Sequence, residues 1–515
     1  MKVQIRTDGC PYYDEMERFL SLFLPDAEII FQDHSAGTGE SEPFDCIIQL
    51  QASQRVDAIH VQGELRISEQ VFQAQHAKAI PAHVEHAAWR KRGKQAVLHV
   101  LHQLLEKLTG EHQPWGILTG VRPLKLVHQM VEQGLPAERI RQQLLQEYLL
   151  SPERAELLLE IADIQLQVVP DLYRLDREVS IYIGIPFCPT HCAYCTFPAY
   201  SMTEKATYVD DFLQAMDLEL VHLGRLLRDY RIPVTSVYVG GGTPTSLKAP
   251  EMERMMESIY REIPNPGQWR EFTVEAGRPD TITPDRVAVM RKYGVNRVSV
   301  NPQTYKASTL KEIGRGHSPA IIDKRFYLVR EAGFENINMD MILGLPGETL
   351  DDVRYTMERI EALAPESVTV HTMSFKRSAV VKNERERFAI PHSQLVRRMM
   401  AEASQWAKGL GYHPYYVYRQ KDILGNMENV GFAKPGKDSI YNICIMEERQ
   451  TIVGIGGGAV SKCIGAGGRH MGRFANPREP KAYVETVDDF LARKDQKLRP
   501  VFESIENANV THMQS

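Results

Sequence analysis

The sequence predicts an α/β protein whose centre is a partial (β/α)6 TIM-like barrel, with an N-terminal α+β and helical region and a C-terminal α+β extension. Three observations support this fold. From Glu178 onward, short apolar runs alternate with amphipathic helical patterns. Crossovers of this length return each strand parallel to the previous one. Polar and glycine-rich motifs follow several of these runs, and barrel proteins place their chemistry at the carboxyl ends of their strands.

The overall composition is that of a globular protein. The 515 residues exceed what one core usually organises, so we expect two or three domains. The formal net charge of −5 argues against nucleic-acid binding as the main task. Residues 1–9 lack the apolar core of a signal peptide, and no apolar run approaches the ~20 residues of a membrane span. We therefore expect a cytoplasmic monomer with no nucleic-acid partner and no membrane span.

The periodicity of the chain changes several times and divides it into four regions. These are a small α+β domain (1–80), a helical connecting region (81–170), the barrel (171–380) and a C-terminal extension that covers the barrel (381–515). In the second region Leu98, Leu101 and Leu105 share one helical face. No motif that carries chemistry is recognised in the first 170 residues.

The barrel region contains six predicted strands and five predicted helices between them. The strands are 179–187, 234–240, 271–275, 297–301, 336–343 and 367–373. The helices are 204–230, 250–262, 283–293, 318–332 and 349–363. In the C-terminal extension, the glycine-rich segment 454–462 has no βαβ frame around it, so we expect a close-packed turn over the barrel mouth rather than a dinucleotide loop.

Three cysteines follow the first strand of the barrel. Cys188, Cys192 and Cys195 lie within eight residues, and thiolate is the soft ligand that iron–sulfur clusters require. Three ligands for four irons leave one iron of a [4Fe–4S] cube open, and we hypothesise that it chelates the amino and carboxylate groups of S-adenosylmethionine. The alternative is zinc with His191 or a distant residue as fourth ligand, although structural zinc sites favour paired two-cysteine knuckles.

Polar residues also follow the later strands. Glycines at 240–242 let backbone carbonyls approach a ligand ammonium, although an ordinary tight turn has the same composition. Glu275 is a candidate acceptor for a ribose hydroxyl, and Gln303 a candidate partner for a ligand carboxylate or sugar. Arg315 offers a planar fork for a carboxylate. Each residue taken alone also fits a structural role.

The cysteine loop resembles a known family. The spacing CxxxCxxC after Ile-Pro-Phe is similar to the motif of radical S-adenosylmethionine enzymes. Residues 182–188 and 194–197 resemble the oxygen-independent coproporphyrinogen III dehydrogenase branch, which also contains a heme chaperone, and the resemblance covers about residues 178–465. It implies a [4Fe–4S] cluster held by the three cysteines and one or two molecules of S-adenosylmethionine per chain.

The resemblance also implies roles for individual residues. Those implied to line S-adenosylmethionine pockets are Tyr182, Gly241, Gly242, Thr243, Glu275, Gln303, Arg315 and Asp340. Tyr194 takes the place of an aromatic residue that borders a second S-adenosylmethionine, and Ser374 and Val460 match positions at the edge of the ligand pockets. The residues expected to act in catalysis or substrate recognition are Tyr182, Arg315, Lys376 and Arg377.

The implied reaction converts two propionate side chains of coproporphyrinogen III to vinyl groups, which gives protoporphyrinogen IX in heme biosynthesis. The implied partners are this or a related tetrapyrrole and an electron-donor protein such as flavodoxin or ferredoxin. Two departures from the family pattern bear on this expectation. Gly184 stands where the family usually has histidine, and Phe197 stands where the better-characterised dehydrogenases have a fourth cysteine. The second departure resembles the heme chaperones, so a heme-binding chaperone without dehydrogenase activity is the alternative.

Overall fold

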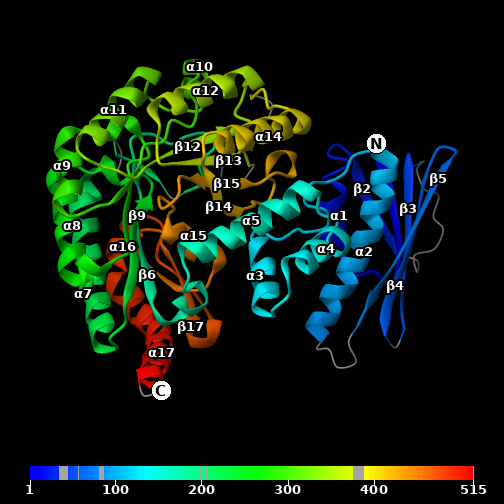
Figure 1. Ribbon diagram of the computed structural model, residues 1–515, viewed down its shortest axis with the longest axis horizontal. Helices are drawn as coiled ribbons and strands as arrows, with labels where there is room; N and C mark the ends of the chain where they lie inside the picture. Colours follow the sequence, from blue (N-terminus) through cyan, green and yellow to red (C-terminus); the bar gives the residue numbers. More distant parts are fainter. Residues whose placement is uncertain are drawn as a thin grey trace. The chain divides into compact units, whose positions relative to one another are not determined.

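The computed structural model describes residues 1–33, 44–55, 57–80, 86–197, 199–202, 206–374 and 388–513. The chain forms two compact units, Met1–Leu159 and Glu160–Ser515, here named the N-terminal unit and the C-terminal unit (Figure 1). Among these described residues, no helix combines the length and the apolar character that crossing a membrane requires.

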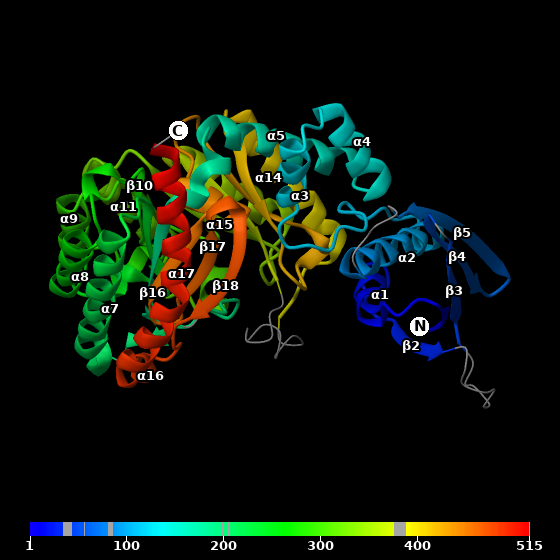
Figure 2. The ribbon, with the colours of Figure 1, turned by 90° about the horizontal axis from the view of Figure 1, so that it is seen from below.

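The N-terminal unit is a five-stranded sheet with helices on one face. Its strands are β1 (Lys2–Asp8), β2 (Glu28–Asp33), β3 (Cys46–Gln54), β4 (Ala58–Ile67) and β5 (Gln70–Ala79), in the spatial order β2-β1-β3-β4-β5. Strands β2, β1 and β3 are parallel, and β3, β4 and β5 are antiparallel. Helices α1 (Tyr13–Leu20) and α2 (His86–Thr109) pack together on this sheet (Figure 2). The helices that follow are α3 (Leu124–Glu132), α4 (Ala137–Glu147) and α5 (Pro152–Val168).

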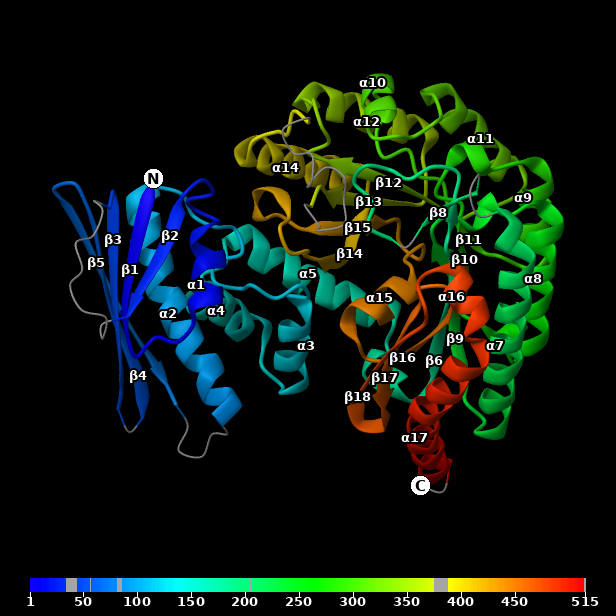
Figure 3. The same ribbon diagram turned by 180° about the vertical axis from the view of Figure 1, so that it is seen from behind.

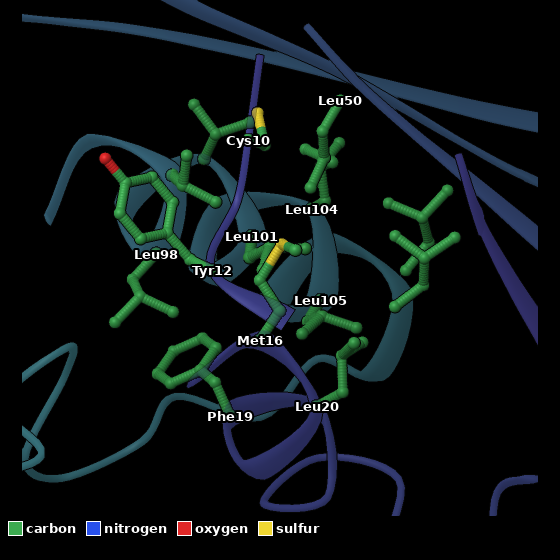
Figure 4. Close-up of a cluster of buried hydrophobic side chains, with 14 of the residues drawn as sticks. Cys10, Tyr12, Met16, Phe19, Leu20, Leu50, Leu98, Leu101, Leu104 and Leu105 are labelled. Atoms are coloured by element: carbon green, nitrogen blue, oxygen red, sulfur yellow. The ribbon is translucent and has the colours of Figure 1, made fainter. Parts of the chain in front are cut away.

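The core of the N-terminal unit lies between α1, α2 and the sheet. Leu98, Leu101, Leu104 and Leu105 of α2 are buried against Tyr12, Met16, Phe19 and Leu20, as Figure 4 shows. Burying each leucine contributes about 1.5–3 kcal/mol. The helix lies so close to the sheet that a Cβ at Gly63 would stand 2.5 Å from a methyl group of Val100, which explains the glycine in the middle of β4.

The C-terminal unit contains an eleven-stranded sheet in the order β14-β15-β13-β12-β11-β10-β9-β6-β16-β17-β18. Its strands are β6 (Val179–Ile185), β9 (Val234–Gly241), β10 (Glu271–Glu275), β11 (Arg297–Ser299), β12 (Ile337–Leu343), β13 (Ser367–Thr372), β14 (His413–Tyr418), β15 (Asn429–Ala433), β16 (Thr451–Gly456), β17 (Val460–Gly465) and β18 (Arg469–Ala475). The central seven strands, from β13 to β16, are parallel. The predicted α/β class with a large parallel sheet is confirmed.

Helices connect the parallel strands and lie along the outer side of the sheet (Figure 3). They are α7 (Val209–Asp229), α8 (Ala249–Glu262), α9 (Pro284–Lys292), α10 (Ala307–Glu312), α11 (Pro319–Glu331) and α12 (Leu350–Leu363). The C-terminal region adds α14 (Ser393–Gly409), α15 (Ile440–Glu447), α16 (Pro480–Glu485) and α17 (Val487–Met513). Because the connected strands are parallel, the motifs that follow them meet at one edge of the sheet.

The segment 454–462, expected to be a glycine-rich turn, contains the end of strand β16, which lies parallel to β6, then a turn, and then the start of β17. The residues of β16 are buried on both faces, as in a central strand of a parallel sheet. Glycine is required because a Cβ at Gly456 would lie 2.3 Å from the carbonyl oxygen of Gly184. A Cβ at Gly184 would in turn lie 3.0 Å from the carbonyl oxygen of Gly457, so the close approach of these two segments favours glycine at position 184 as well.

A buried ion pair joins the helices to the end of β16. Lys494 Nζ of α17 lies 2.6 Å from Glu219 Oε1 of α7, and the two side chains are 2% and 1% exposed. The other oxygen of Glu219 accepts hydrogen bonds from the backbone of Gly456 at 2.8 Å and from the hydroxyl of Tyr483 at 2.5 Å. Asn476 Nδ2 donates to Oε1 at 2.8 Å. This saturated network compensates the cost of burying both charges.

Candidate functional site

A cavity of about 390 Å³ opens at the carboxyl edge of the parallel strands. The predicted site residues that line it are Tyr182, Cys188, Cys192, Tyr194, Cys195, Gly241, Gly242, Thr243, Glu275, Gln303, Arg315, Asp340 and Ser374. Val460 does not line it: this residue begins β17 and is 41% exposed. Lys376 and Arg377 lie outside the described residues. The strand ends thus bring together side chains that are far apart in the sequence.

The cysteine loop is held in place by hydrogen bonds to two neighbouring segments. Cys188 ends the short strand β7 (Phe187–Cys188), which pairs with β8 (Tyr200–Ser201), and its sulfur lies 3.3 Å from Thr243 Oγ1. The backbone N–H of Ala193 donates to Ile313 O at 3.0 Å, and Thr190 Oγ1 donates to Gly314 O at 2.8 Å. All three cysteines line one cavity, and this soft donor set fits an iron–sulfur cluster.

Arg278 fastens the same loop from the end of β10. Its Nη1 donates to Thr190 Oγ1 at 2.9 Å and to the sulfur of Cys192 at 3.6 Å. Asp280 accepts from Nε at 3.0 Å and from Nη2 at 2.9 Å, and His317 Nδ1 lies 3.5 Å from the same carboxylate. Burial raises the pKa of Asp280, but His317 and Arg278 outweigh it and hold this pKa well below its usual range. The carboxylate is ionised and keeps the guanidinium in position.

Arg315 is a buried cation with an unusual set of partners. It is 4% exposed, and its Nη1 donates to the hydroxyl of Tyr194 at 2.9 Å. Its Nη2 donates to the carbonyl oxygens of Gly277 at 2.6 Å and Asn301 at 2.9 Å. Within the described part of the chain, no carboxylate pairs with this guanidinium and its Nε has no hydrogen-bond partner. A buried, unpaired charge is costly, so the arrangement suits an anionic ligand.

Gln303 combines backbone strain with an unpaired acceptor. Its φ of +64° lies in the left-handed region, which few residues other than glycine adopt. Hydrogen bonds to the backbone of β12 hold this conformation: Gln303 N donates to Asp340 O and Ile342 N donates to Gln303 O, both at 2.9 Å. Its Oε1 is buried and has no hydrogen-bond partner among the described residues. Strain that the fold enforces and an open acceptor together indicate a ligand contact.

Glu275 lies beside a stack of tyrosines in the cavity. Burial raises the pKa of Glu275 to about 7, and the hydroxyl of Tyr238 donates to Oε1. The Tyr238 ring stacks on that of Tyr441 with centroids 4.3 Å apart, and the Tyr182 ring lies 6.2 Å from that of Tyr238. A Cβ at Gly240 would lie 2.9 Å from Glu275 Oε2, so glycine there makes room for the carboxyl group.

The remaining predicted residues have structural partners in the same cavity. Asp340 accepts from Asn301 Nδ2 at 2.8 Å and Asn338 Nδ2 at 2.7 Å, and His371 Nε2 lies 3.6 Å away. Burial raises the pKa of Asp340, but His371 and these hydrogen bonds lower it further than burial raises it. A Cβ at Gly242 would lie 2.6 Å from the carbonyl oxygen of Phe187. Packing of the strand end against the cysteine loop is therefore a sufficient reason for glycine at this position.

The sequence pattern missed two tyrosines that line the cavity. Nothing in the local sequence of Tyr238 and Tyr441 distinguishes them from residues of a hydrophobic core. Tyr416 and Tyr418 of β14 also line the cavity.

Comparison with known proteins identifies the family. A model described as "Radical SAM superfamily" matches residues 182–360, and a curated relative is 44% identical over 501 residues. The chain therefore belongs to the radical S-adenosylmethionine superfamily. That relative is the "oxygen-independent coproporphyrinogen-III oxidase-like protein HemZ" of Bacillus subtilis (strain 168), and the match covers 97% of this chain and 99% of the relative.

Other similarities cover less of the chain. The "heme chaperone HemW" of Bacillus subtilis is 30% identical over 310 residues, which are 60% of this chain and 76% of that protein. The solved structure of the coproporphyrinogen III oxidase HemN from Escherichia coli, described as a radical SAM enzyme, superposes with a TM-score of 0.50 at 23% identity. It covers 63% of this chain and 72% of the HemN chain, and it shows that the two share their fold.

Membership in the superfamily implies a [4Fe–4S] cluster and S-adenosylmethionine. The geometry of the cavity is consistent with both groups. Three cysteines of one loop line the cavity together with Arg315 and Gln303, for which the described residues provide no carboxylate partner and no donor to Oε1, respectively. The cysteines are the residues that would hold the cluster.

Proposed function

We propose that this protein is an oxygen-independent coproporphyrinogen III dehydrogenase that converts two propionate side chains to vinyl groups and so forms protoporphyrinogen IX. The observation that carries the proposal is the cavity itself, in which three thiols and the unpaired guanidinium of Arg315 face the same space. The similarity over nearly full length to a coproporphyrinogen oxidase-like protein supports this choice of substrate.

In this proposal Cys188, Cys192 and Cys195 hold a [4Fe–4S] cluster. The chemistry that the cluster and S-adenosylmethionine supply when bound is one-electron reduction of the sulfonium and abstraction of a hydrogen atom. One hydrogen atom is removed from the β-carbon of each propionate. The carboxylate then leaves as CO2, and one further electron passes to a one-electron acceptor, which produces the vinyl group. An electron-donor protein such as flavodoxin or ferredoxin supplies the reducing electron.

The residues of the chain bind and orient the two organic molecules. Arg315 pairs with the carboxylate of S-adenosylmethionine, and Gln303 and Glu275 accept hydrogen bonds from its hydroxyl or ammonium groups. Glu275 is half protonated near neutral pH because burial raises its pKa to about 7, and a donor on the ligand favours its ionised form. The tyrosine stack of Tyr182, Tyr238 and Tyr441 forms an apolar wall that excludes water.

Propionate recognition is assigned to Lys376 and Arg377, which follow β13 in the sequence. The adjoining described residue, Ser374, lines the cavity and donates a hydrogen bond to Gln420 Oε1. The positive charges of these two residues match the negative charges of the substrate's carboxylates.

The second candidate function is a heme chaperone without dehydrogenase activity. The observation that favours it is Phe197, which stands at the position of the dehydrogenases' fourth cysteine and is 57% exposed at the cavity. An exposed aromatic ring at the mouth of a cavity suits a flat, apolar ligand such as heme. The similarity to HemW over 60% of the chain is compatible with this reading.

One anaerobic assay separates the two functions. The reconstituted full-length protein is incubated with dithionite, S-adenosylmethionine and coproporphyrinogen III, and 5′-deoxyadenosine and tetrapyrrole products are measured together. We expect both 5′-deoxyadenosine and protoporphyrinogen IX. Formation of deoxyadenosine without decarboxylation would support the radical chemistry and rule out coproporphyrinogen III as the substrate. Neither product, together with stoichiometric heme binding, would replace the proposal with the chaperone.

A matched pair of variants tests the role of Arg315. Arg315→Gln removes the charge at the cavity. We expect deoxyadenosine formation to fall roughly 10- to 100-fold, because one charge-assisted hydrogen bond is lost. Arg286→Gln is the control, because Arg286 is bonded to the carbonyl oxygens of Leu247 and Thr281 and does not line the cavity. Equal rates in the two variants would contradict the assignment.

A further inference from the structure

A cluster of three metal-ligating side chains lies in the N-terminal unit, at the carboxyl end of α2. His102 and Glu106 are four residues apart on this helix, so both project from the same face. The helix ends at Thr109, and Gly110 with a φ of +70° turns the chain so that His112 lies beside Glu106. No chemistry is predicted for this unit from its sequence.

The separations between the three side chains match one bound ion. His102 Nδ1 lies 3.5 Å from Glu106 Oε2, and His112 Nδ1 lies 2.9 Å from Glu106 Oε1. One ligand atom from each of the three residues can be chosen so that all lie within 4.8 Å of one another. Neighbouring ligands of a tetrahedral zinc ion are about 3.4 Å apart, given metal–ligand distances of about 2.0–2.2 Å.

His102 provides a second and independent observation. Its side chain is 1% exposed, and neither ring nitrogen has a hydrogen-bond partner in the described part of the chain. The rings of Phe19 and Phe23 pack beside it with centroids 6.1 and 5.6 Å away, and the ring of His112 lies 4.9 Å away. Buried imidazoles nearly always have a partner, so an unpaired one next to a carboxylate and a second imidazole points to a ligand.

The surroundings of the cluster favour a cation and allow it to enter. The carboxyl end of a helix carries partial negative charge, and Glu106 adds a full one. The side chains of Glu106 and His112 are 42% and 39% exposed, so one side of the cluster is open to solvent. Two imidazole nitrogens and a carboxylate oxygen form a donor set that zinc and similar first-row ions prefer over calcium or magnesium.

We propose that His102, Glu106 and His112 bind one divalent transition-metal ion, Zn²⁺ in the first instance, with water completing the coordination. The ion joins the last turn of α2 to the segment that follows it. Its role is to stabilise the end of the long helix whose leucines form the core of the N-terminal unit. This site uses none of the residues of the cysteine cavity, so it is independent of the proposed reaction.

The experiment uses the full-length chain with Cys188, Cys192 and Cys195 replaced by alanine, which removes the competing thiols of the cavity. After dialysis against Zn²⁺ and gel filtration we expect one equivalent of zinc per chain by elemental analysis. Titration with Co²⁺ should give the visible absorption of a tetrahedral site without sulfur ligands. Zn²⁺ should also raise the melting temperature of this protein.

His112→Ala in the same background is the decisive variant, because His112 is partly exposed outside the helix and its loss leaves the core intact. We expect zinc affinity to fall by more than about 100-fold, beyond the 10- to 100-fold that outer-shell changes cause. His60→Ala is the control: His60 lies between the buried Ile59 and Val61 on β4, so its side chain points to the opposite face of the sheet. The proposal is overturned if the parent binds no zinc, or if His112→Ala and the parent bind zinc equally and have equal melting temperatures. In either case only a hydrogen-bonded His–Glu pair remains.

Discussion

Arg278 donates a hydrogen bond to the sulfur of Cys192 at 3.6 Å, although 86 residues separate them in the chain. The guanidinium is in turn fixed by both oxygens of Asp280. This contact places a permanent positive charge against one of the three thiols that face the cavity. Hydrogen bonds and cations next to cluster sulfurs raise the reduction potential, because they stabilise the more negative reduced state.

We therefore predict that Arg278→Gln lowers the reduction potential of the reconstituted cluster. The expected shift is roughly 60 mV, which for a one-electron couple corresponds to ~1.4 kcal/mol, the lower end for a charged hydrogen bond. Spectroelectrochemical titration measures it, and Arg286→Gln again serves as the control. An unchanged potential with a normal cluster spectrum would show that Arg278 only holds the loop.

Loss of a thiol from the loop should abolish cluster binding. For Cys192→Ala we predict that anaerobic reconstitution yields neither the iron content nor the absorption of a [4Fe–4S] cluster, since two thiolates cannot hold it at an open edge. The control is Cys444→Ala, whose thiol is fully buried and does not line the cavity. Burial raises the pKa of Cys444 above its usual range, so its inert thiol should not matter for the cluster. An intact cluster spectrum for Cys192→Ala would reject the ligand assignment.

Removal of one partner of the buried pair Glu219 and Lys494 should destabilise the C-terminal unit. Lys494→Met leaves Glu219 buried and uncompensated, and we expect the free energy of unfolding to fall by about 3–5 kcal/mol. Denaturant titration followed by far-UV circular dichroism measures this change. Lys497→Met is the control on the same helix, because Lys497 is exposed and should change stability by less than ~0.5 kcal/mol. Equal midpoints for the two variants would contradict this account.

The N-terminal unit should lose stability in mild acid. Burial, together with His99 and Lys78, lowers the pKa of His76 to about 4, while nearby Glu147 acts in the opposite direction. Between about pH 6.5 and 4 the unfolded chain therefore binds a proton that the folded chain excludes, so stability is full above pH 6.5 and declines as the pH falls. The rings of His76 and His99 stack 3.7 Å apart, which disfavours charging both.

Unfolding measured at pH 7 and pH 5 tests this sign. We expect the difference in stability between the two pH values to be smaller for His76→Gln than for the parent protein, because the titrating group is gone. His60→Gln, on the same sheet, should leave the difference as it is in the parent. A parent protein that becomes more stable on acidification would show that other groups decide the acid behaviour of this unit.

Those parts of the protein that depend on a local pattern could be predicted from the amino-acid sequence. Apolar runs separated by amphipathic helices are sufficient to predict β6 and β9 to β13, because period and length distinguish strands from helices. The same reasoning placed the cysteine loop and Gln303 at strand ends. In a parallel sheet all those ends meet at one edge, so a one-dimensional pattern already implies a shared site.

Contacts between residues that are far apart in the chain depend on the tertiary fold. Strand β16 begins 266 residues after the end of β6, yet the two strands pair. The glycines of β16 suggested a turn in the sequence, because the reason for them, the close approach of Gly184, exists only in the folded protein. Arg278 follows β10 closely in the sequence, but this position carries no information about Cys192. His102, Glu106 and His112 are near in sequence, yet whether they converge depends on how the chain turns after α2.

The physical reason is that local sequence encodes dihedral preference and the side of an element that is apolar, which are properties of short segments. Pairing of buried charges and metal ligands depends on packing, where each element is placed by all its neighbours. Glu219 and Lys494 are 275 residues apart, and either would read alone as a solvated helix residue. Their partnership exists only because folding removes both from water at the same place.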